Sequence, residues 1–344
     1  MINGAPRILI VRLSAIGDVV RVLPALHALR EAHPNAQIDW AVEHKAAAIL
    51  EDHPALDRLL VFKRPQAVKA AARAFWRFCR DVRTSRYDVL IDFHGIFKSG
   101  LISAYSAVPD RYGFARPRAQ ELSHLFTNHK LKLPSPDFNR VEENLLLCEA
   151  VCPGRGSLCR RRSPLDVAIY VPPEIEDEVN AFFEDTFDGG KRVVAVHAPV
   201  DRPEKQWPLD HFAELADLLL ADGRFEVMLT WGTGQFAAVR KVLDKVRRHP
   251  VVAPEMPTLK HYACLVHRAD LYFGGDTGPM HIAAAMGTPV AAVFGGSDPA
   301  KHAPYRRPCE ILRDETPGLA VEERLRRVTP EMAYEACVRL AGSA

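Results

Sequence analysis

Short apolar-rich runs alternate with longer amphipathic stretches along the first half of the chain. The short runs are RILIVRL (7–13), QIDWAVE (37–43) and YDVLIDF (87–93), each of a length typical of a buried strand. Helical patterns such as PALHALREAH (24–33) and AVKAAARAFWRFCRDV (67–82) lie between them. This alternation predicts an α/β fold with mainly parallel sheets.

The alternation restarts in the second half, after a stretch rich in Pro, Gly, Ser and Arg from about 152 to 173, which we interpret as a linker. The further strand patterns are RVVAVHA (192–198), FEVMLT (225–230), LYFGG (271–275) and PVAAVFG (289–295). The helical patterns at 208–223 and 279–287 each end in a glycine that suits a left-handed cap. We therefore predict two open α/β domains, residues 1–165 and 166–344, with ligands at the carboxyl ends of the strands. The last helix is expected to pack back on the first domain.

The composition is that of ordinary globular domains. Of 344 residues, 48% are hydrophobic and 26% are charged, which allows a core in each domain. No apolar run approaches the ~20 residues of a membrane span, and no signal stretch is recognisable, so we expect neither a span nor secretion. The nearest cysteine grouping, Cys148, Cys152 and Cys159, lacks a histidine at ligand spacing. Reduced thiols in a cytoplasm are therefore expected rather than a zinc site.

The net charge of +2 conceals an asymmetry between the two halves of the chain. Residues 1–168 contain 25 Lys and Arg against 17 Asp and Glu, whereas the remainder contains 20 against 26. A basic half indicates an anionic partner for that half. Composition alone leaves nucleic acid, anionic lipid and a phosphorylated substrate open.

The segment DLYFGGDTGPMHIAAAMGTPVAAVFGGSDP (270–299) carries the clearest candidate binding site. A strand pattern ends in two glycines, Asp276 or Thr277 suits the helix N-cap, and proline follows in the first turn. A helix N-terminus presents free N–H groups and the positive end of the helix dipole, which together favour phosphate. Gly278 allows close approach of a ligand to the backbone, and His281 is placed to donate to a phosphate oxygen. A capped helix without a ligand is the alternative.

Two other glycine-rich or polar loops follow strand patterns in the same half. Lys205 lies in a long loop just before a predicted helix, where it is placed either to contact a diphosphate or to remain a surface lysine. The stretch FEVMLTWGTGQ suits the border of a base or ribose pocket. Together these loops favour a nucleotide-sugar or dinucleotide site. Neither Gly-x-Gly-x-x-Gly after the first strand nor a Walker motif is present, which argues against typical NAD and P-loop enzymes.

Asp18 follows the first predicted strand, in RILIVRLSAIGDVVRVLPAL. Its carboxylate suits the N-terminus of a helix, where a capping side chain contributes about 1 kcal/mol. A carboxylate there is also able to accept a proton from a substrate. Pro24 suits the first turn of a helix that begins later, which would leave Asp18 in the loop. The residues alone favour the cap and leave the base as the alternative.

Several of these motifs resemble those of the glycosyltransferase family 9 heptosyltransferases. The matching segments are SAIGDVVRVLPAL, YDVLIDFHGIFKSG, HLFTN, EKQWP and GGDTGPMHIAAAMGTPVAAVFGGSDP, and they extend over nearly the whole chain. Asp92, Gly95, Lys98 and Ser99 resemble the type that adds the first heptose. The resemblance implies a GT-B fold of two Rossmann-like domains with a cleft between them. It also implies transfer of heptose from ADP-L-glycero-D-manno-heptose to Kdo in the lipopolysaccharide inner core, at the cytoplasmic face of the inner membrane.

The same resemblance implies roles for individual residues. Asp18 matches the general base and Lys205 a lysine at the donor phosphates. The residues that match the donor loop and the adenine pocket are Asp276, Thr277, Gly278, His281 and Met256. Related enzymes have an acidic residue shortly after the Trp-Gly pair that contacts the donor ribose, whereas Gln235 is the hydrogen-bonding group here. This departure leaves the use of another nucleotide sugar as an alternative.

The acceptor is expected to meet the basic half. Lys69, Arg73, Arg77, Arg80 and Arg83 fall on one side of the helical pattern at 67–82 and just beyond it, with Ala72, Phe75, Cys79 and Val82 on another. This is either a solvated amphipathic helix or a platform for lipid A phosphates, Kdo carboxylates or anionic headgroups. Arg64, Lys98, Arg116, Arg118 and Lys130 are expected to add to it. No motif for nucleic acid is present.

The chain contains no Asp-x-Asp pair of the kind that holds a divalent metal in many glycosyltransferases. Lys205, His281 and the N–H groups around Gly278 are therefore expected to stabilise the leaving diphosphate, with no metal or other cofactor. The alternatives are addition of a later heptose, use of another nucleotide sugar, a non-catalytic nucleotide-sugar-binding protein, and a dehydrogenase.

Overall fold

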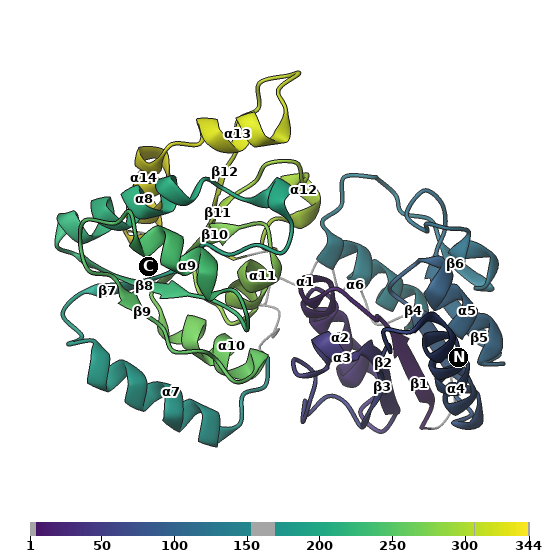
Figure 1. The fold of residues 1–344 in the computed structure, drawn as a ribbon. Helices are drawn as coiled ribbons and strands as arrows, with labels where there is room; N and C mark the ends of the chain where they lie inside the picture. Colours follow the sequence, from purple (N-terminus) through teal and green to yellow (C-terminus); the bar gives the residue numbers. More distant parts are fainter. Residues whose placement is uncertain (1–4, 153–168, 306, 343–344) are drawn as a thin grey trace. The chain divides into compact units, whose positions relative to one another are not determined.

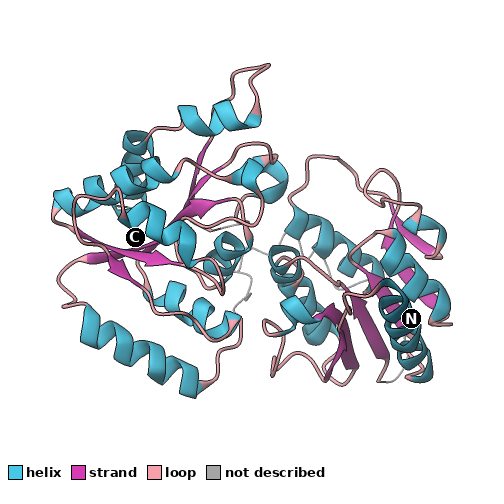
Figure 2. Cartoon of the chain, viewed as in Figure 1, coloured by secondary structure: helices cyan, strands magenta, loops and turns pink. Residues whose placement is uncertain are grey.

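The computed structural model describes residues 5–152, 169–305 and 307–342. The chain divides into two compact units, Met1–Tyr170 and Val171–Ala344. Each unit has one parallel sheet with helices on both faces (Figures 1 and 2). The expected boundary between residues 165 and 166 lies outside the described residues.

The first unit has the strand order β3-β2-β1-β4-β5-β6, with all neighbours parallel. The order reverses between β1 and β4, so the crevice where open α/β sheets bind ligands lies beyond the carboxyl ends of these two strands. The strands are β1 (Arg7–Val11), β2 (Gln37–Glu43), β3 (Arg58–Phe62), β4 (Val89–Asp92), β5 (Asp110–Phe114) and β6 (His129–Leu131). The helices are α1 (Ile16–Val20), α2 (Leu23–Ala32), α3 (His44–Ala47), α4 (Val68–Thr84), α5 (Phe97–Tyr105), the 3-10 helix η1 (Ser123–Leu125) and α6 (Arg140–Val151).

One face of this sheet is covered by α4 and α5. Phe78, Cys79 and Val82 of α4 pack in one core cluster with Leu9 and Leu90 of the central strands. The expected apolar face of α4 included Ala72, which is exposed. Residues 68–73 are mostly exposed, because the first turns of α4 lie outside the apolar cluster, and burial begins one turn later. The apolar spacing predicted from the sequence therefore marks the buried face only in the later turns of α4.

The second unit repeats the same topology. Its order is β12-β11-β10-β7-β8-β9, and the reversal falls between β7 and β10. The strands are β7 (Arg192–His197), β8 (Phe225–Thr230), β9 (Val251–Val252), β10 (Leu271–Gly275), β11 (Val290–Val293) and β12 (Cys309–Leu312). The helices are α7 (Pro173–Thr186), the 3-10 helix η3 (Pro203–Lys205), α8 (Leu209–Asp222), α9 (Phe236–Leu243), α10 (Leu259–Arg268), α11 (Gly278–Ala285), α12 (Pro299–His302), α13 (Val321–Arg327) and α14 (Pro330–Gly342).

An aromatic cluster fixes the loop that leads into α8. Trp207, Phe212 and Phe273 are buried against one another, with ring centroids 4.8–5.8 Å apart. The Trp207 indole N–H donates to the Val328 carbonyl at 2.9 Å, which ties this loop to the segment before α14. The last helix, α14, contacts α8, β10, β11 and β12 of its own unit. Its expected packing on the first domain stays a prediction.

Candidate functional site

The loops after β7 and β10 bring three of the expected donor residues together. Lys205, in η3, donates from Nζ to Asp276 Oδ2 at 2.7 Å and to the Asp276 carbonyl at 2.8 Å. His281 Nε2 lies 3.6 Å from Asp276 Oδ1. Because β7 and β10 are neighbours at the point where the strand order reverses, this cluster occupies the edge where a ligand is expected.

The Asp276 carboxylate is held ionised inside this cluster. Its side chain is 7% exposed, and burial alone would raise its pKa. The hydrogen bonds and charges of His281 and Lys205 outweigh burial and hold the pKa of Asp276 well below its usual range. A buried acceptor of fixed charge is suited to bind hydroxyl groups, while Lys205 keeps 29% of its side chain exposed toward solvent.

The helix that follows has an open N-terminus. Thr277 is the N-cap of α11, as expected for this position, but its side chain makes no capping hydrogen bond. Its hydroxyl instead donates to the Gly275 carbonyl at 3.4 Å. Gly278 and Pro279 form the first turn, so the backbone N–H groups of the helix start and its dipole face the same edge of the sheet as Lys205.

Gln235 is already engaged in its own loop. It is the N-cap residue of α9; its Oε1 accepts the Gly232 N–H at 3.0 Å, and its Nε2 donates to Asp201 Oδ1 at 3.0 Å. The sequence reasoning missed Asp201. Asp201 could have been identified as a carboxylate in the loop after β7, because β7 and β8 are neighbouring parallel strands whose following loops lie at the same edge of the sheet. Met256 follows β9, the edge strand beyond β8, and is half-buried.

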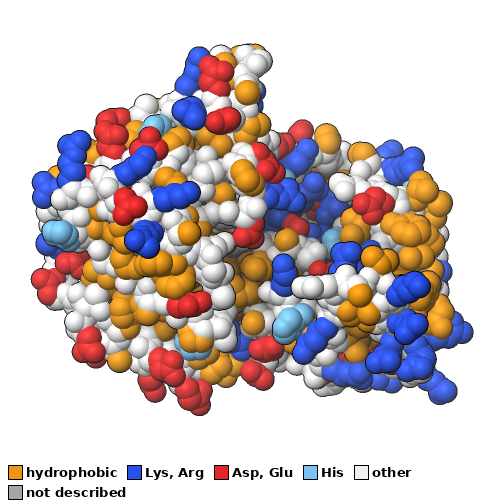
Figure 3. Space-filling view, in the orientation of Figure 1, with side chains coloured by type: hydrophobic (Ala, Val, Ile, Leu, Met, Phe, Trp, Pro, Cys, Tyr) orange, Lys and Arg blue, Asp and Glu red, His pale blue; other side chains and the backbone are white. Residues whose placement is uncertain are grey.

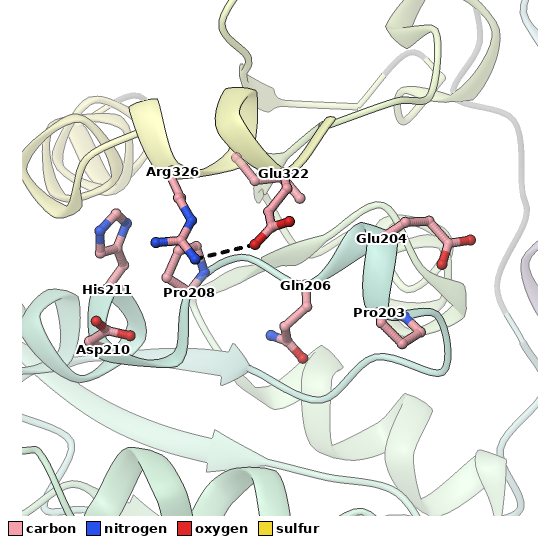
Figure 4. Close-up of a pocket in the computed structure, with 9 residues that line it drawn as sticks. Pro203, Glu204, Gln206, Pro208, Asp210, His211, Glu322 and Arg326 are labelled. Carbon is pink, nitrogen blue, oxygen red and sulfur yellow. Dashed lines mark hydrogen bonds and ion pairs between the residues drawn. The ribbon is translucent and has the colours of Figure 1, made fainter. Parts of the chain in front are cut away.

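A pocket of about 820 Å³ lies beside η3 (Figure 4). Its walls come from η3, the start of α8 and α13, and they carry an ion pair between Glu322 and Arg326 at 3.2 Å. Lys205 and Asp276 do not line it. The pocket is therefore lined by the neighbours of Lys205 in the chain, Glu204 and Gln206, and not by the predicted donor residues themselves.

In the first unit, Asp18 is the third residue of the short helix α1. The N-cap is Ala15, whose N–H donates to Asp18 Oδ2 at 3.3 Å, so Asp18 closes the cap from inside the helix. Pro24 lies in the first turn of the next helix, α2, as expected, but Asp18 is helical rather than in the loop. Asp18 also forms ion pairs with Arg12 through Oδ2 and with Arg21 through Oδ1. Its side chain is 31% exposed.

Arg12 and His94 lie beside Asp18 and were not singled out from the sequence. Burial lowers the pKa of Arg12 to about 10, against the opposing effect of Asp18, so Arg12 stays protonated at neutral pH. Burial and the charge of Arg12 lower the pKa of His94 to about 3. Neutral His94 accepts the Leu13 N–H on Nδ1 at 3.3 Å, which places its proton on Nε2. His94 could have been identified from its position just after β4, because β4 and β1 are neighbours where the strand order reverses.

The expected acceptor residues separate into two groups. Lys98 and Arg118 lie close enough to act on His94, but both are paired: Lys98 with Glu43, and Arg118 Nε with Glu143 Oε2 at 2.6 Å. The other eight are exposed, and they are Arg64, Lys69, Arg73, Arg77, Arg80, Arg83, Arg116 and Lys130. The structure thus places charged groups next to Asp18 and a separate set of exposed cations on α4, in the loop before it, and around η1.

Comparison with known proteins identifies the family. Residues 75–330 match the model of glycosyltransferase family 9 (heptosyltransferase). The chain is 28% identical over 304 residues to lipopolysaccharide heptosyltransferase 1 of Escherichia coli strain K12, covering 85% of this chain and 89% of that protein. It is also 28% identical over 317 residues to lipopolysaccharide heptosyltransferase 1 of Pseudomonas aeruginosa, covering 88% and 82%.

Solved structures support the same fold. The E. coli ADP-heptose lipopolysaccharide heptosyltransferase II superposes with a TM-score of 0.79 at 20% identity, covering 98% of this chain and 99% of that one. The E. coli heptosyltransferase WaaC with ADP superposes with a TM-score of 0.75 at 24% identity, covering 97% and 99%. Two Rossmann-like units of the order seen here constitute the expected GT-B fold. The chain therefore belongs to glycosyltransferase family 9, the heptosyltransferase family of lipopolysaccharide core biosynthesis.

Proposed function

We propose that this glycosyltransferase transfers heptose from ADP-L-glycero-D-manno-heptose to a Kdo residue of Kdo-lipid A, with inversion at the anomeric carbon. The proposed donor site rests on one observation, the Lys205–Asp276–His281 cluster at the open N-terminus of α11. A relative named lipopolysaccharide heptosyltransferase 1, and a structural neighbour solved with ADP-2-deoxy-2-fluoro heptose, support this donor.

The second unit is proposed to bind the donor. The diphosphate would accept hydrogen bonds from the N–H groups at the start of α11, where Thr277 leaves the cap open. Lys205 would stabilise the negative charge that grows on the leaving diphosphate, with His281 close by. Asp276 is an ionised acceptor suited to heptose hydroxyls. Met256 and Gln235 are proposed to border the adenosine, with Asp201 at the ribose through Gln235.

The first unit is proposed to supply the base. The acceptor hydroxyl oxygen forms a bond to the anomeric carbon while its proton passes to the Asp18 carboxylate. The bond from the anomeric carbon to the diphosphate breaks, and its electron pair leaves with ADP. A single displacement needs one base and forms no covalent enzyme intermediate, so it inverts the configuration.

Mass spectrometry of the reaction product tests this function. ADP-heptose is incubated with a delipidated Kdo acceptor, and GDP- and UDP-sugars serve as control donors. We expect the acceptor to gain the mass of one heptose residue from ADP-heptose alone. Transfer from GDP- or UDP-sugars would indicate a transferase for another nucleotide sugar. Transfer only to a heptosylated acceptor would indicate addition of a later heptose. Binding of ADP-heptose without transfer would indicate a non-catalytic binding protein.

We expect the transfer to be independent of divalent metal, because Lys205 and the start of α11 already place positive charge where the diphosphate leaves. Treatment with EDTA should leave kcat within about twofold of the untreated enzyme. The measurement is initial rate at saturating donor before and after chelation. A rate that falls with EDTA and returns with Mg²⁺ or Mn²⁺ would contradict this expectation.

We further propose that the acceptor is met at the anionic cytoplasmic surface of the inner membrane through the α4 side of the first unit. Exposed large apolar residues gather on α4, α5 and the segment around η1: Val68, Trp76, Phe97, Tyr105, Leu122 and Leu125. The rings of Trp76 and Tyr105 lie 5.6 Å apart, next to exposed arginines of α4. Figure 3 shows apolar and basic surface together over this region. Interfacial aromatic residues with flanking cations suit an anionic bilayer.

Among the described residues, no helix combines the length and the apolar character that crossing a bilayer requires.

The charge-reversed variant Arg73→Glu/Arg77→Glu tests the membrane surface. With Kdo-lipid A in vesicles containing phosphatidylglycerol, the apparent acceptor KM should rise at least about 30-fold, since each of the two cations contributes ~1 kcal/mol near an anionic surface and reversal adds repulsion. The donor Kd should stay unchanged. The matched control is Arg240→Glu/Lys241→Glu on exposed positions of α9, which should behave as wild type. An equal loss with a delipidated acceptor would assign these arginines to acceptor binding rather than to the bilayer.

A further inference from the structure

His94 lies just after β4, at the crevice of the first unit. β4 and β1 are neighbouring parallel strands at the point where the strand order reverses, so the loops that follow them border that crevice. Leu13, two residues beyond β1, donates its N–H to His94 Nδ1 at 3.3 Å. The imidazole therefore joins the two segments of chain that leave the sheet at this edge.

The backbone around His94 is fixed by buried groups. The His94 N–H donates to Asp92 Oδ1 at 2.9 Å, and the Gly95 N–H donates to the same oxygen at 3.0 Å. The carbonyl of the preceding residue, Phe93, accepts a hydrogen bond from Arg12 Nη1 at 2.9 Å. Because both the backbone and the ring are hydrogen-bonded, His94 is held in one position before any ligand arrives.

The two ring nitrogens of His94 have different roles. The lone pair of Nδ1 accepts the Leu13 N–H, so the single proton of the neutral ring is on Nε2. The charged groups that act on the ring come from the ends of β1 and β5 and from α1 and α5, and they are Arg12, Asp18, Lys98 and Arg118. Burial and the three cations lower the pKa of His94 to about 3, against the opposing effect of the carboxylate. His94 is therefore a hydrogen-bond donor without formal charge, and it has no lone pair left to act as a base.

The Nε2–H group of His94 is open to a ligand. Within the described part of the chain, Nε2 forms no hydrogen bond. The side chain is only half-buried, and Nε2 does not belong to the buried polar atoms that lack a partner. A fixed, accessible donor beside the proposed base is suited to orient a polar substrate.

We propose that the Nε2–H of His94 donates a hydrogen bond to a hydroxyl oxygen of the acceptor sugar, and so directs a neighbouring hydroxyl toward Asp18. The inference rests on the proposed function, in which Asp18 is the base. The bonded oxygen is not the attacking one, because a donated hydrogen bond would draw electron density from the nucleophile. A neutral donor suits an uncharged hydroxyl, whereas the guanidinium groups beside it suit anions. His94 is thus a specificity-determining residue of the acceptor site.

Acceptors that lack single hydroxyl groups test this contact on the full-length protein. A delipidated Kdo saccharide is compared with its monodeoxy analogues, each lacking one hydroxyl other than the one that receives heptose. In the wild type, one analogue should have a kcat/KM about 5- to 100-fold below that of the parent, the range for leaving one donor unpaired. In His94→Met, which keeps a weak acceptor for the Leu13 N–H but has no donor, the parent should lose a similar factor. The same analogue should then differ from the parent by less than about twofold.

His94→Gln and His267→Met are the matched variants. The glutamine amide offers both an acceptor for Leu13 and a donor for the sugar, so His94→Gln should keep most of the preference for the parent acceptor. His267 is an exposed histidine of α10 in the second unit, whose Nδ1 also bonds to the backbone, at the Met286 carbonyl. His267→Met should keep the full wild-type preference. Thermal unfolding of each variant shows whether it is folded.

The pH profile distinguishes a neutral donor from an imidazolium. The ratio of kcat/KM between the wild type and His94→Gln cancels the titrations that both share, and it should stay within about twofold between about pH 5.5 and 8.5. A ratio that rises as the pH falls through ~6.5 would show a charged donor and contradict the proposal. Equal use of all analogues by the wild type, or an unchanged preference in folded His94→Met, also overturns it. Absence of transfer to the parent acceptor by the wild type would instead reject the proposed function itself.

Discussion

Replacing Asp18 with Asn is expected to lower kcat by about 10²- to 10⁴-fold, the range for loss of a general base. The asparagine amide oxygen still accepts a hydrogen bond from the Ala15 N–H, so the start of α1 is kept. It cannot take the proton of the acceptor hydroxyl at neutral pH. The Kd for ADP-heptose should change less than about threefold, because the proposed donor residues all belong to the second unit.

The kinetics of Asp18→Asn are measured beside its calorimetric donor affinity and its thermal unfolding. Asp57→Asn serves as the matched control, because it removes a carboxylate from an arginine pair in the same unit. That control should retain wild-type kcat. If Asp18→Asn kept kcat within tenfold of the wild type while folded, Asp18 would be a capping residue and not the base.

Replacing Lys205 with Ala is expected to lower kcat/KM for the donor by about 10²- to 10³-fold, the range for removal of one group that stabilises a developing anion. Lys205 also neutralises Asp276, so its loss leaves a buried carboxylate with His281. Lys205→Arg should retain more activity than Lys205→Ala. Lys245→Ala, which removes an exposed ion pair with Asp210, should have wild-type kinetics. Wild-type kcat/KM in Lys205→Ala would exclude Lys205 from the donor site.

The Lys205 pair also predicts a pH dependence of stability. The pKa of Asp276 is depressed in the folded protein, so its stabilising contribution is present above the pKa of the unfolded carboxyl and is lost as the pH falls through the folded pKa. Without Lys205 the pKa of Asp276 is depressed less, and that contribution should be lost at a higher pH. Acid unfolding of Lys205→Ala should therefore begin at higher pH than that of the wild type. Coincident acid transitions would show that the pair contributes little.

The long elements of the fold were predictable because their periodicity is strong. The runs at 192–198 and 225–230 contain β7 and β8, and the stretch at 279–287 lies over α11. The strands β3, β5, β6, β9 and β12 were not predicted. They have two to five residues, and most of their positions are half-buried or exposed, so their apolar runs are short or absent.

The sequence allowed the candidate residues within each loop to be predicted, but not the contacts between residues of different loops. Lys205 and Asp276 are 71 positions apart, and the pairing of β7 with β10 is what brings them together. The strand predicted over 7–13 ends at Val11, so Arg12 leaves the strand and turns toward Asp18. A run of apolar residues does not reveal that change of direction. The sequence also gives no sign that Gln235 is bonded to Asp201, because that contact depends on two loops of different strands.

The anomeric configuration of the product tests the central claim most directly: one carboxylate in the first unit acts against a donor held by the second. Proton NMR of the product made by the full-length protein in the presence of EDTA measures it. The account predicts a product whose anomeric configuration is inverted relative to the donor. A product of retained configuration, or a heptosyl-enzyme adduct trapped on quenching, would contradict it.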